Sequence, residues 1–101
     1  MKVFISQPMT GRTKEEILSE RNKIVETLNK CDIEVLDSYF EDYDPQDRST
    51  PIKYLAKSIE VLADADILLC VGNWENSRGC KVEYECAKQY GISIFYWNSD
   101  Y

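Results

Sequence analysis

Short apolar runs alternate along the chain with segments in which apolar residues recur every three or four positions. The runs predict strands, and the segments between them predict helices. We expect strands at 2–6, 33–40, 67–71 and 92–97 and helices at about 13–30, 50–63 and 80–90. The run ILLCV at 67–71 is continuously apolar, as is typical of a central parallel strand covered on both faces. The predicted order is therefore β-α-β-α-β-α-β.

Local signals mark where two of these helices begin. Thr13 and Glu16 form a capping-box pattern, and Pro51 follows Thr50 at a first helical position, where proline is well tolerated. With right-handed crossovers, the order predicts a single α/β domain over residues 1–101. We expect a small doubly wound three-layer sandwich of the flavodoxin or Rossmann type, with a four-stranded parallel sheet in the order 2-1-3-4.

Such sheets bind ligands beyond the carboxyl ends of their strands, at the point where the strand order reverses. In the predicted order this point lies between the first and third strands, so the loops at 6–12 and 72–79 should meet there. Each loop leads into a helix, whose amino terminus can receive an anion. A plain turn followed by a helix cap explains the first loop equally well.

Composition and charge narrow the range of partners. The chain is 44% apolar and 30% charged, with no apolar run near the roughly 20 residues that a membrane span requires. Its beginning does not read as a signal peptide, so we expect a cytoplasmic protein that does not bind membranes. A formal charge of −6 without a basic cluster makes DNA or RNA an improbable partner.

The cysteines and the missing histidine argue against metal chemistry. The four cysteines, at positions 31, 70, 80 and 86, form no CxxC pair, and the chain has no histidine. Reduced, mostly packed thiols are the interpretation that fits this pattern. We therefore expect no metal and no cofactor, and no mechanism that needs an imidazole base.

Glu83 interrupts the apolar face of the last predicted helix. Its neighbours three, four and seven positions onward are Cys86, Ala87 and Tyr90, so its carboxylate should face protein rather than water. A buried carboxylate needs a compensating partner or has a function. Arg21 interrupts the apolar stripe of the first helix in the same way, so the two could simply pair. Alternatively, Glu83 is a nucleophile or base on the floor of a pocket.

The spacing Gly79-x-x-x-Glu83-x-x-x-Ala87-x-x-x-Gly91, after a strand opened by Asp66, resembles the core of the nucleoside 2-deoxyribosyltransferases and of the related 2'-deoxynucleoside 5'-monophosphate N-glycosidases. The stretches FISQPMTGRT and WENSRGCKVEYECA look most like the short bacterial and phage branch of this family. The resemblance spans most of the chain in order.

The resemblance implies the fold derived above and an N-glycosidic reaction on a small-molecule nucleoside or nucleotide. In that family the glutamate that matches Glu83 attacks C1′ of the deoxyribose. Ser77 matches a serine that holds the phosphate in the monophosphate N-glycosidases, which favours a nucleotide over a bare nucleoside as the substrate. The candidate substrate-binding residues are Ser6, Gln7, Pro8, Met9, Gly11, Arg12, Ser58, Asn73, Trp74, Ser77, Arg78 and Gly79.

One departure from the family weighs against catalysis. Ser58 stands where the family has an aspartate that positions the sugar and assists the leaving base. A non-catalytic nucleotide sensor or sequestering protein is therefore the alternative function, and an interaction module with a paired Glu83 is a third. The aromatic residues Phe95, Tyr96, Trp97 and Tyr101, the last of which lies outside the residues that the structure describes, predict association into a homo-oligomer, with a dimer as the expected form. Packing in the core is the alternative explanation for Phe95 and Trp97.

Overall fold

The computed structural model describes residues 1–9, 11–36 and 50–97. Its elements are β1 (Lys2–Ser6), α1 (Lys14–Lys30), β2 (Glu34–Val35), α2 (Thr50–Leu62), β3 (Ile67–Val71), the 3-10 helix η1 (Trp74–Asn76), α3 (Arg78–Gln89) and β4 (Ser93–Trp97). The predicted alternation of strands and helices is confirmed. Of the expected second strand, 33–40, only Glu34–Val35 form β2: Ile33 and Leu36 lie outside the strand, and residues 37–40 lie outside the described residues.

The four strands form one parallel sheet in the order β2-β1-β3-β4, which confirms the predicted topology. β1 and β3 are the central strands, and their register places Ser6 opposite Cys70 at the carboxyl end of the pair. The strand order reverses between them, so loops from both strands emerge at the same edge of the sheet.

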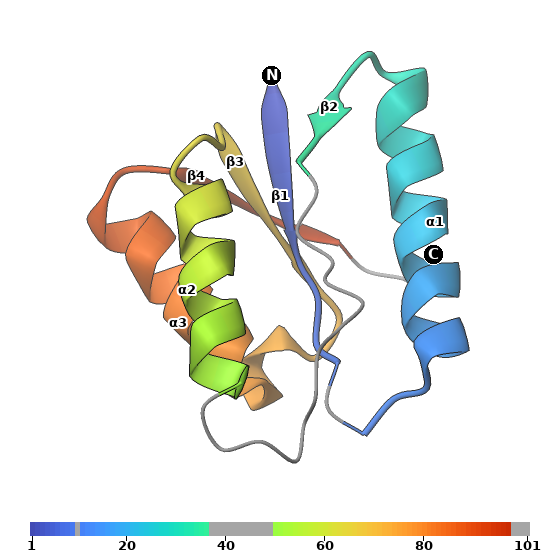
Figure 1. Ribbon diagram of the computed structural model, residues 1–101. Helices are drawn as coiled ribbons and strands as arrows, with labels where there is room; N and C mark the ends of the chain where they lie inside the picture. The colour runs from blue at the N-terminus through green and yellow to red at the C-terminus, as the bar shows by residue number, and fades with distance from the viewer. Residues whose placement is uncertain (10, 37–49, 98–101) are drawn as a thin grey trace.

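Helices cover both faces of the sheet, with α1 on one side and α2 and α3 on the other (Figure 1). Alternate β1 side chains reach the two layers: Val3 and Ile5 pack with Ile24 of α1, whereas Phe4 packs with Leu62 of α2 and Ala87 of α3. A side chain of β1 therefore meets α1 or the α2–α3 layer according to its position in the strand.

Side-chain caps fix where the two helices beside the sheet edge begin. The Thr13 hydroxyl accepts a hydrogen bond from the backbone N–H of Glu16 at 3.1 Å, as the capping-box pattern predicts. The Ser77 hydroxyl caps α3 in the same way, accepting from the N–H of Cys80 at 3.4 Å. None of the helices in the described ranges is long and apolar enough to cross a membrane.

The end of α3 differs from the expected helix. The helix stops at Gln89, and Tyr90 caps it with a non-helical backbone. Tyr90 is 84% exposed, although the helical pattern placed it on the buried face with Glu83. That prediction required the helix to continue through residue 90, whereas it ends one residue earlier.

Candidate functional site

Glu83 lies in α3 with its carboxylate against the carboxyl end of β1. Its side chain points into the protein, as the helical pattern predicts, and the residue is only 8% exposed. The Ser6 hydroxyl, at the last position of β1, donates a hydrogen bond to Glu83 Oε1 at 2.7 Å. The described part of the chain offers no such bond to Oε2. One oxygen is thus held in place, and the other is available for chemistry.

Burial controls the protonation of this carboxyl group. Removal from water raises the pKa of Glu83 to about 7, and the hydrogen bond from Ser6 offsets part of that rise. Near neutral pH the side chain can therefore exist as either carboxylate or acid. Carboxyl groups tuned in this way serve as nucleophiles, bases or acids in enzymes.

Glu83 and Arg21 lie on opposite faces of the sheet. Arg21 belongs to α1 and is buried beside Ile17 and Ile24, where its guanidinium donates to the Leu36 carbonyl at 3.5 Å. Glu83 belongs to the α3 layer and accepts from Ser6. The structure therefore does not contain the Glu83–Arg21 pair that the sequence left open, because β1 and its neighbours separate the two helices (Figure 1).

Two buried thiols adjoin Glu83. Cys70 is the β3 residue opposite Ser6, and Cys80 lies one turn before Glu83 on α3. Burial, with smaller contributions from Cys80 and Glu83, raises the pKa of Cys70 to about 12. Burial also raises the pKa of Cys80, and hydrogen bonds with Ser6 and Ser77 offset part of this rise. Both groups therefore stay neutral thiols at physiological pH.

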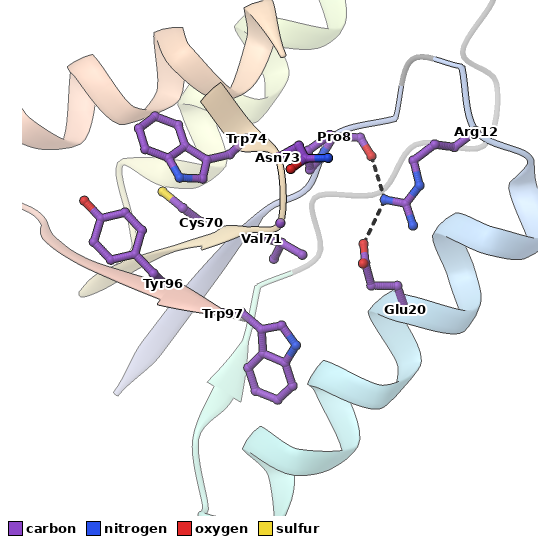
Figure 2. A pocket seen from close by; sticks show the side chains of 10 residues that line it. Pro8, Arg12, Glu20, Cys70, Val71, Asn73, Trp74, Tyr96 and Trp97 are labelled. Atoms are coloured by element: carbon purple, nitrogen blue, oxygen red, sulfur yellow. Dashed lines mark hydrogen bonds and ion pairs between the residues drawn. The ribbon is translucent and has the colours of Figure 1, made fainter. Parts of the chain in front are cut away.

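A cleft of about 610 Å³ opens at this edge of the sheet. Its described lining residues are Pro8, Arg12, Glu20, Cys70, Val71, Gly72, Asn73, Trp74, Tyr96 and Trp97. Trp74 and Tyr96 lie on one side of it, and Arg12 and Glu20 lie on the other (Figure 2). Cys70 connects the cleft to the buried group around Glu83, because it lines the cleft and pairs with Ser6 in the sheet.

The aromatic side of the cleft is built from three elements. The Trp74 ring of η1 stacks on Tyr84 of α3, with centroids 4.6 Å apart and planes at 25°. Tyr96 of β4 tilts toward Trp74 at 6.1 Å and is 61% exposed. Gly72, with φ of +54°, allows the chain to turn out of β3 toward η1 in a conformation that other residues rarely adopt. The result is a ring surface suited to a flat ligand.

The opposite side of the cleft holds an ion pair. Arg12 donates from one guanidinium nitrogen to Glu20 Oε1 at 2.8 Å and to the Pro8 carbonyl at 3.1 Å. Buried Gln7 donates to the same carboxylate oxygen at 3.0 Å and to the Ile17 carbonyl at 2.8 Å. Arg12, a candidate substrate-binding residue from the sequence, is thus already bound to a carboxylate.

The predicted substrate-binding residues separate into those that line the cleft and those that do not. Pro8, Arg12, Asn73 and Trp74 line it. Ser6 and Gln7 are buried behind it, and Ser77 caps α3. The others lie outside the described lining: Met9, Gly79 and Ser58 are half-buried, whereas Gly11 and Arg78 are exposed.

Several lining residues were not predicted from the sequence. Cys70, Val71, Tyr96 and Trp97 lie at the carboxyl ends of β3 and β4, where such sheets bind ligands, and Gly72 belongs to the loop 72–79 that was expected there. Glu20 could have been found by the criterion used for Glu83. It lies three residues after Ile17 and four before Ile24, and thus on the edge of a buried stripe.

The chemistry available at this edge is that of carboxylates, hydroxyls and aromatic rings. In the described ranges no three His, Cys, Asp or Glu side chains come together as a metal site would require. A carboxylate with one free oxygen lies behind a cleft that has an aromatic side and a polar side. That arrangement can hold a flat, polar small molecule and present a nucleophile or proton carrier to it.

Comparison with known proteins agrees with this architecture. A solved structure of the 2-deoxyribosyltransferase from the bacterium Bacillus psychrosaccharolyticus superposes with a TM-score of 0.72 at 15% identity, covering 97% of this chain and 72% of that one. This likeness establishes a deoxyribosyltransferase-like fold. A search of curated proteins gives no match. Residues 1–96 match the DUF4406 family, described as a domain of unknown function, so this chain belongs to the DUF4406 family.

Proposed function

We propose that this protein binds a 2′-deoxynucleoside or deoxynucleotide in the cleft and cleaves its N-glycosidic bond with Glu83 as the nucleophile. The observation that carries the proposal is Glu83 itself, a buried carboxylate held at 2.7 Å by Ser6, whose sheet neighbour Cys70 lines the cleft. The similarity in fold to a 2-deoxyribosyltransferase supports the same class of reaction.

The proposed reaction has two steps. Oε2 of ionised Glu83 attacks C1′ of the deoxyribose while the C1′–N bond breaks, and the base leaves with the bonding electron pair and takes up a proton from solvent. The resulting glycosyl ester then reacts with water, or with the nitrogen of a second base, which releases Glu83 as a carboxylate and gives up a proton to solvent. Hydrolysis and transfer differ only in this second nucleophile.

The two sides of the cleft suit the two ends of such a substrate. Trp74 and Tyr96 offer ring faces for the base, and stacking of this kind tolerates different bases. Asn73 and the polar groups near Arg12 provide hydrogen-bond partners for a sugar. Ser6 holds Oε1, which leaves Oε2 for the attack on the sugar.

The test is to incubate the protein with each 2′-deoxynucleoside and each monophosphate and to measure free base by chromatography. We expect base release that is lost in Glu83→Gln. Glu85→Gln is the matched control, because Glu85 is an exposed carboxylate two residues away that bonds to Gln89. Base release that survives in Glu83→Gln would refute the proposed nucleophile.

A non-catalytic nucleoside binder is the second candidate. Two observations favour it: Glu83 is not among the described lining residues, and half-buried Ser58 offers no carboxylate where the resembling enzymes have one. Saturable binding of a nucleoside without base release would identify this function. The measurement covers pH 6 to 9, a range that spans the Glu83 pKa of about 7. Release of base would exclude it.

A further inference from the structure

Arg12 and Glu20 are the charged side chains among the described residues that line the cleft. They form an ion pair at 2.8 Å, with side chains 27% and 19% exposed. Their charges cancel, so this part of the cleft carries no net positive charge with which to attract an anion. The chain as a whole has a formal charge of −6, which adds repulsion toward a phosphate dianion.

The pair is held by more than its own attraction. The same Arg12 nitrogen also donates to the Pro8 carbonyl at 3.1 Å, which fixes the guanidinium against the loop after β1. Gln7 holds Glu20 from behind: its amide nitrogen donates to Glu20 Oε1 at 3.0 Å and to the Ile17 carbonyl at 2.8 Å. A flip of the Gln7 amide would place its oxygen next to two acceptors, the Ile17 carbonyl and Glu20 Oε1, so this orientation of the amide is fixed.

Glu20 consequently presents an acceptor to the cleft. Both of its hydrogen bonds from the described residues end on Oε1, which leaves Oε2 without a donor from that part of the chain. A hydroxyl or N–H of a neutral ligand can donate to this oxygen, whereas a phosphate group brings only acceptors and negative charge. Ser77, which matches a phosphate-holding serine, caps α3 by accepting from the N–H of Cys80 and is not among the described residues that line the cleft.

We propose that Glu20 is a specificity-determining residue: by holding Arg12 and presenting an open acceptor, it selects an uncharged 2′-deoxynucleoside over the 5′-monophosphate. This inference rests on the proposed function for the identity of the ligand. It reverses the preference for a nucleotide that the position of Ser77 suggests from the sequence. Removing the charge of Glu20 frees Arg12 to bind a phosphate.

The test measures binding and turnover of 2′-deoxyadenosine and 2′-deoxyadenosine 5′-monophosphate separately. Dissociation constants are measured by calorimetry in a Glu83→Gln background, where neither ligand can be consumed, and kcat/KM is measured with intact Glu83. We expect the protein to favour the nucleoside. Glu20→Gln should shift the ratio of the two affinities toward the monophosphate by on the order of tenfold, as for loss of one charged hydrogen-bond partner.

Two further variants separate this role from a general effect of charge. Glu15→Gln removes the same charge from an exposed position of α1 outside the described lining and should leave the ratio unchanged. Adding Arg12→Gln to Glu20→Gln should abolish the gain for the monophosphate, because the gain depends on the released guanidinium. Thermal unfolding of each variant confirms that it is folded.

Three results would overturn the inference. These are tighter binding of the monophosphate by the protein with Glu20 intact, an unchanged ratio in Glu20→Gln, or an equal shift in Glu15→Gln. Failure of the proposed function is distinguishable: binding of both ligands without base release refutes the catalytic role of Glu83, while the ratio of affinities still decides the role of Glu20. If neither ligand binds, both proposals are wrong.

Discussion

The Ser6 hydroxyl lies 2.7 Å from Glu83 Oε1 although 77 positions separate the two residues in the chain. Donation of this hydrogen bond stabilises the ionised carboxylate and offsets part of the rise due to burial, which leaves the pKa of Glu83 at about 7. The central strand thus helps to set the protonation state of a side chain on α3. The first prediction follows from this contact.

Ser6→Ala should raise the pKa of Glu83 further, because burial would then act without the opposing hydrogen bond. If ionised Glu83 is the nucleophile, activity rises with pH through its pKa, and the variant should need a higher pH to reach half of its maximal rate. A pH–rate profile of kcat measures the change. Ser19→Ala, an exposed serine of α1, is the control and should keep the original profile.

Glu83→Gln should stabilise the protein at alkaline pH. The pKa of Glu83 is about 7 in the folded protein and 4.5 ordinarily, so the folded state binds this proton more tightly than the unfolded state. The carboxyl group therefore costs stability increasingly as pH rises from 4.5 through 7. A glutamine never ionises, so we expect a gain of up to about 3 kcal/mol at pH 8 and almost none at pH 4.5.

Urea unfolding of both proteins at the two pH values checks this prediction. Glu85→Gln, which alters an exposed carboxylate on the same helix, should show no comparable dependence on pH. The same stability difference at pH 4.5 and pH 8 would mean that the carboxyl group of Glu83 has an ordinary pKa.

Tyr96→Ser should weaken nucleoside binding without unfolding the protein. Tyr96 is 61% exposed and its ring centroid lies 6.1 Å from that of Trp74, so loss of the ring removes stacking area rather than core packing. Loss of one aromatic stacking partner costs about 1–3 kcal/mol, or about 5- to 150-fold in affinity. Tyr96→Phe keeps the ring and should bind nearly as well as the original. Equal affinities of these two variants, measured by calorimetry, would exclude the ring from the site.

The thiols should differ sharply in reactivity. Cys31 is exposed at the end of α1, whereas Cys70 and Cys80 are buried with raised pKa values. Because the thiolate is the reactive form, a maleimide or an aromatic disulfide at pH 8 should modify Cys31 first. The fast phase should disappear in Cys31→Ser, and Cys70 should react only after urea is added. Rapid labelling of Cys70 in the native protein, located by peptide mass spectrometry, would contradict this.

The fold was predictable because its signals are local. Strand runs, helical spacing and the helix-start signals at Thr13 and Pro51 fix the order of elements, and the handedness of parallel crossovers then leaves few topologies. The burial of Glu83 was predictable for the same reason, since three-to-four spacing alone places it beside Ala87.

The partners of the site residues were less predictable. The ion pair of Arg12 with Glu20 depends on the path of the loop between β1 and α1, and no periodicity specifies that path. The role of Tyr96 in the cleft depends on which face of β4 meets η1, which follows from the sheet register. To predict that Arg21 lies apart from Glu83, one must know which helix covers which face of the sheet (Figure 1).

The all-parallel sheet has a consequence for how the protein must be assembled during synthesis. Each strand pair needs a crossover, so Val3 finds its neighbour Ile67 only after most of the polypeptide has left the ribosome. Topologies dominated by such distant pairings fold slowly and leave unpaired edges exposed meanwhile. A nascent chain that ends before α3 contains Ser6 but lacks Glu83, to which Ser6 donates its hydrogen bond. Ligand binding would therefore indicate that folding is complete.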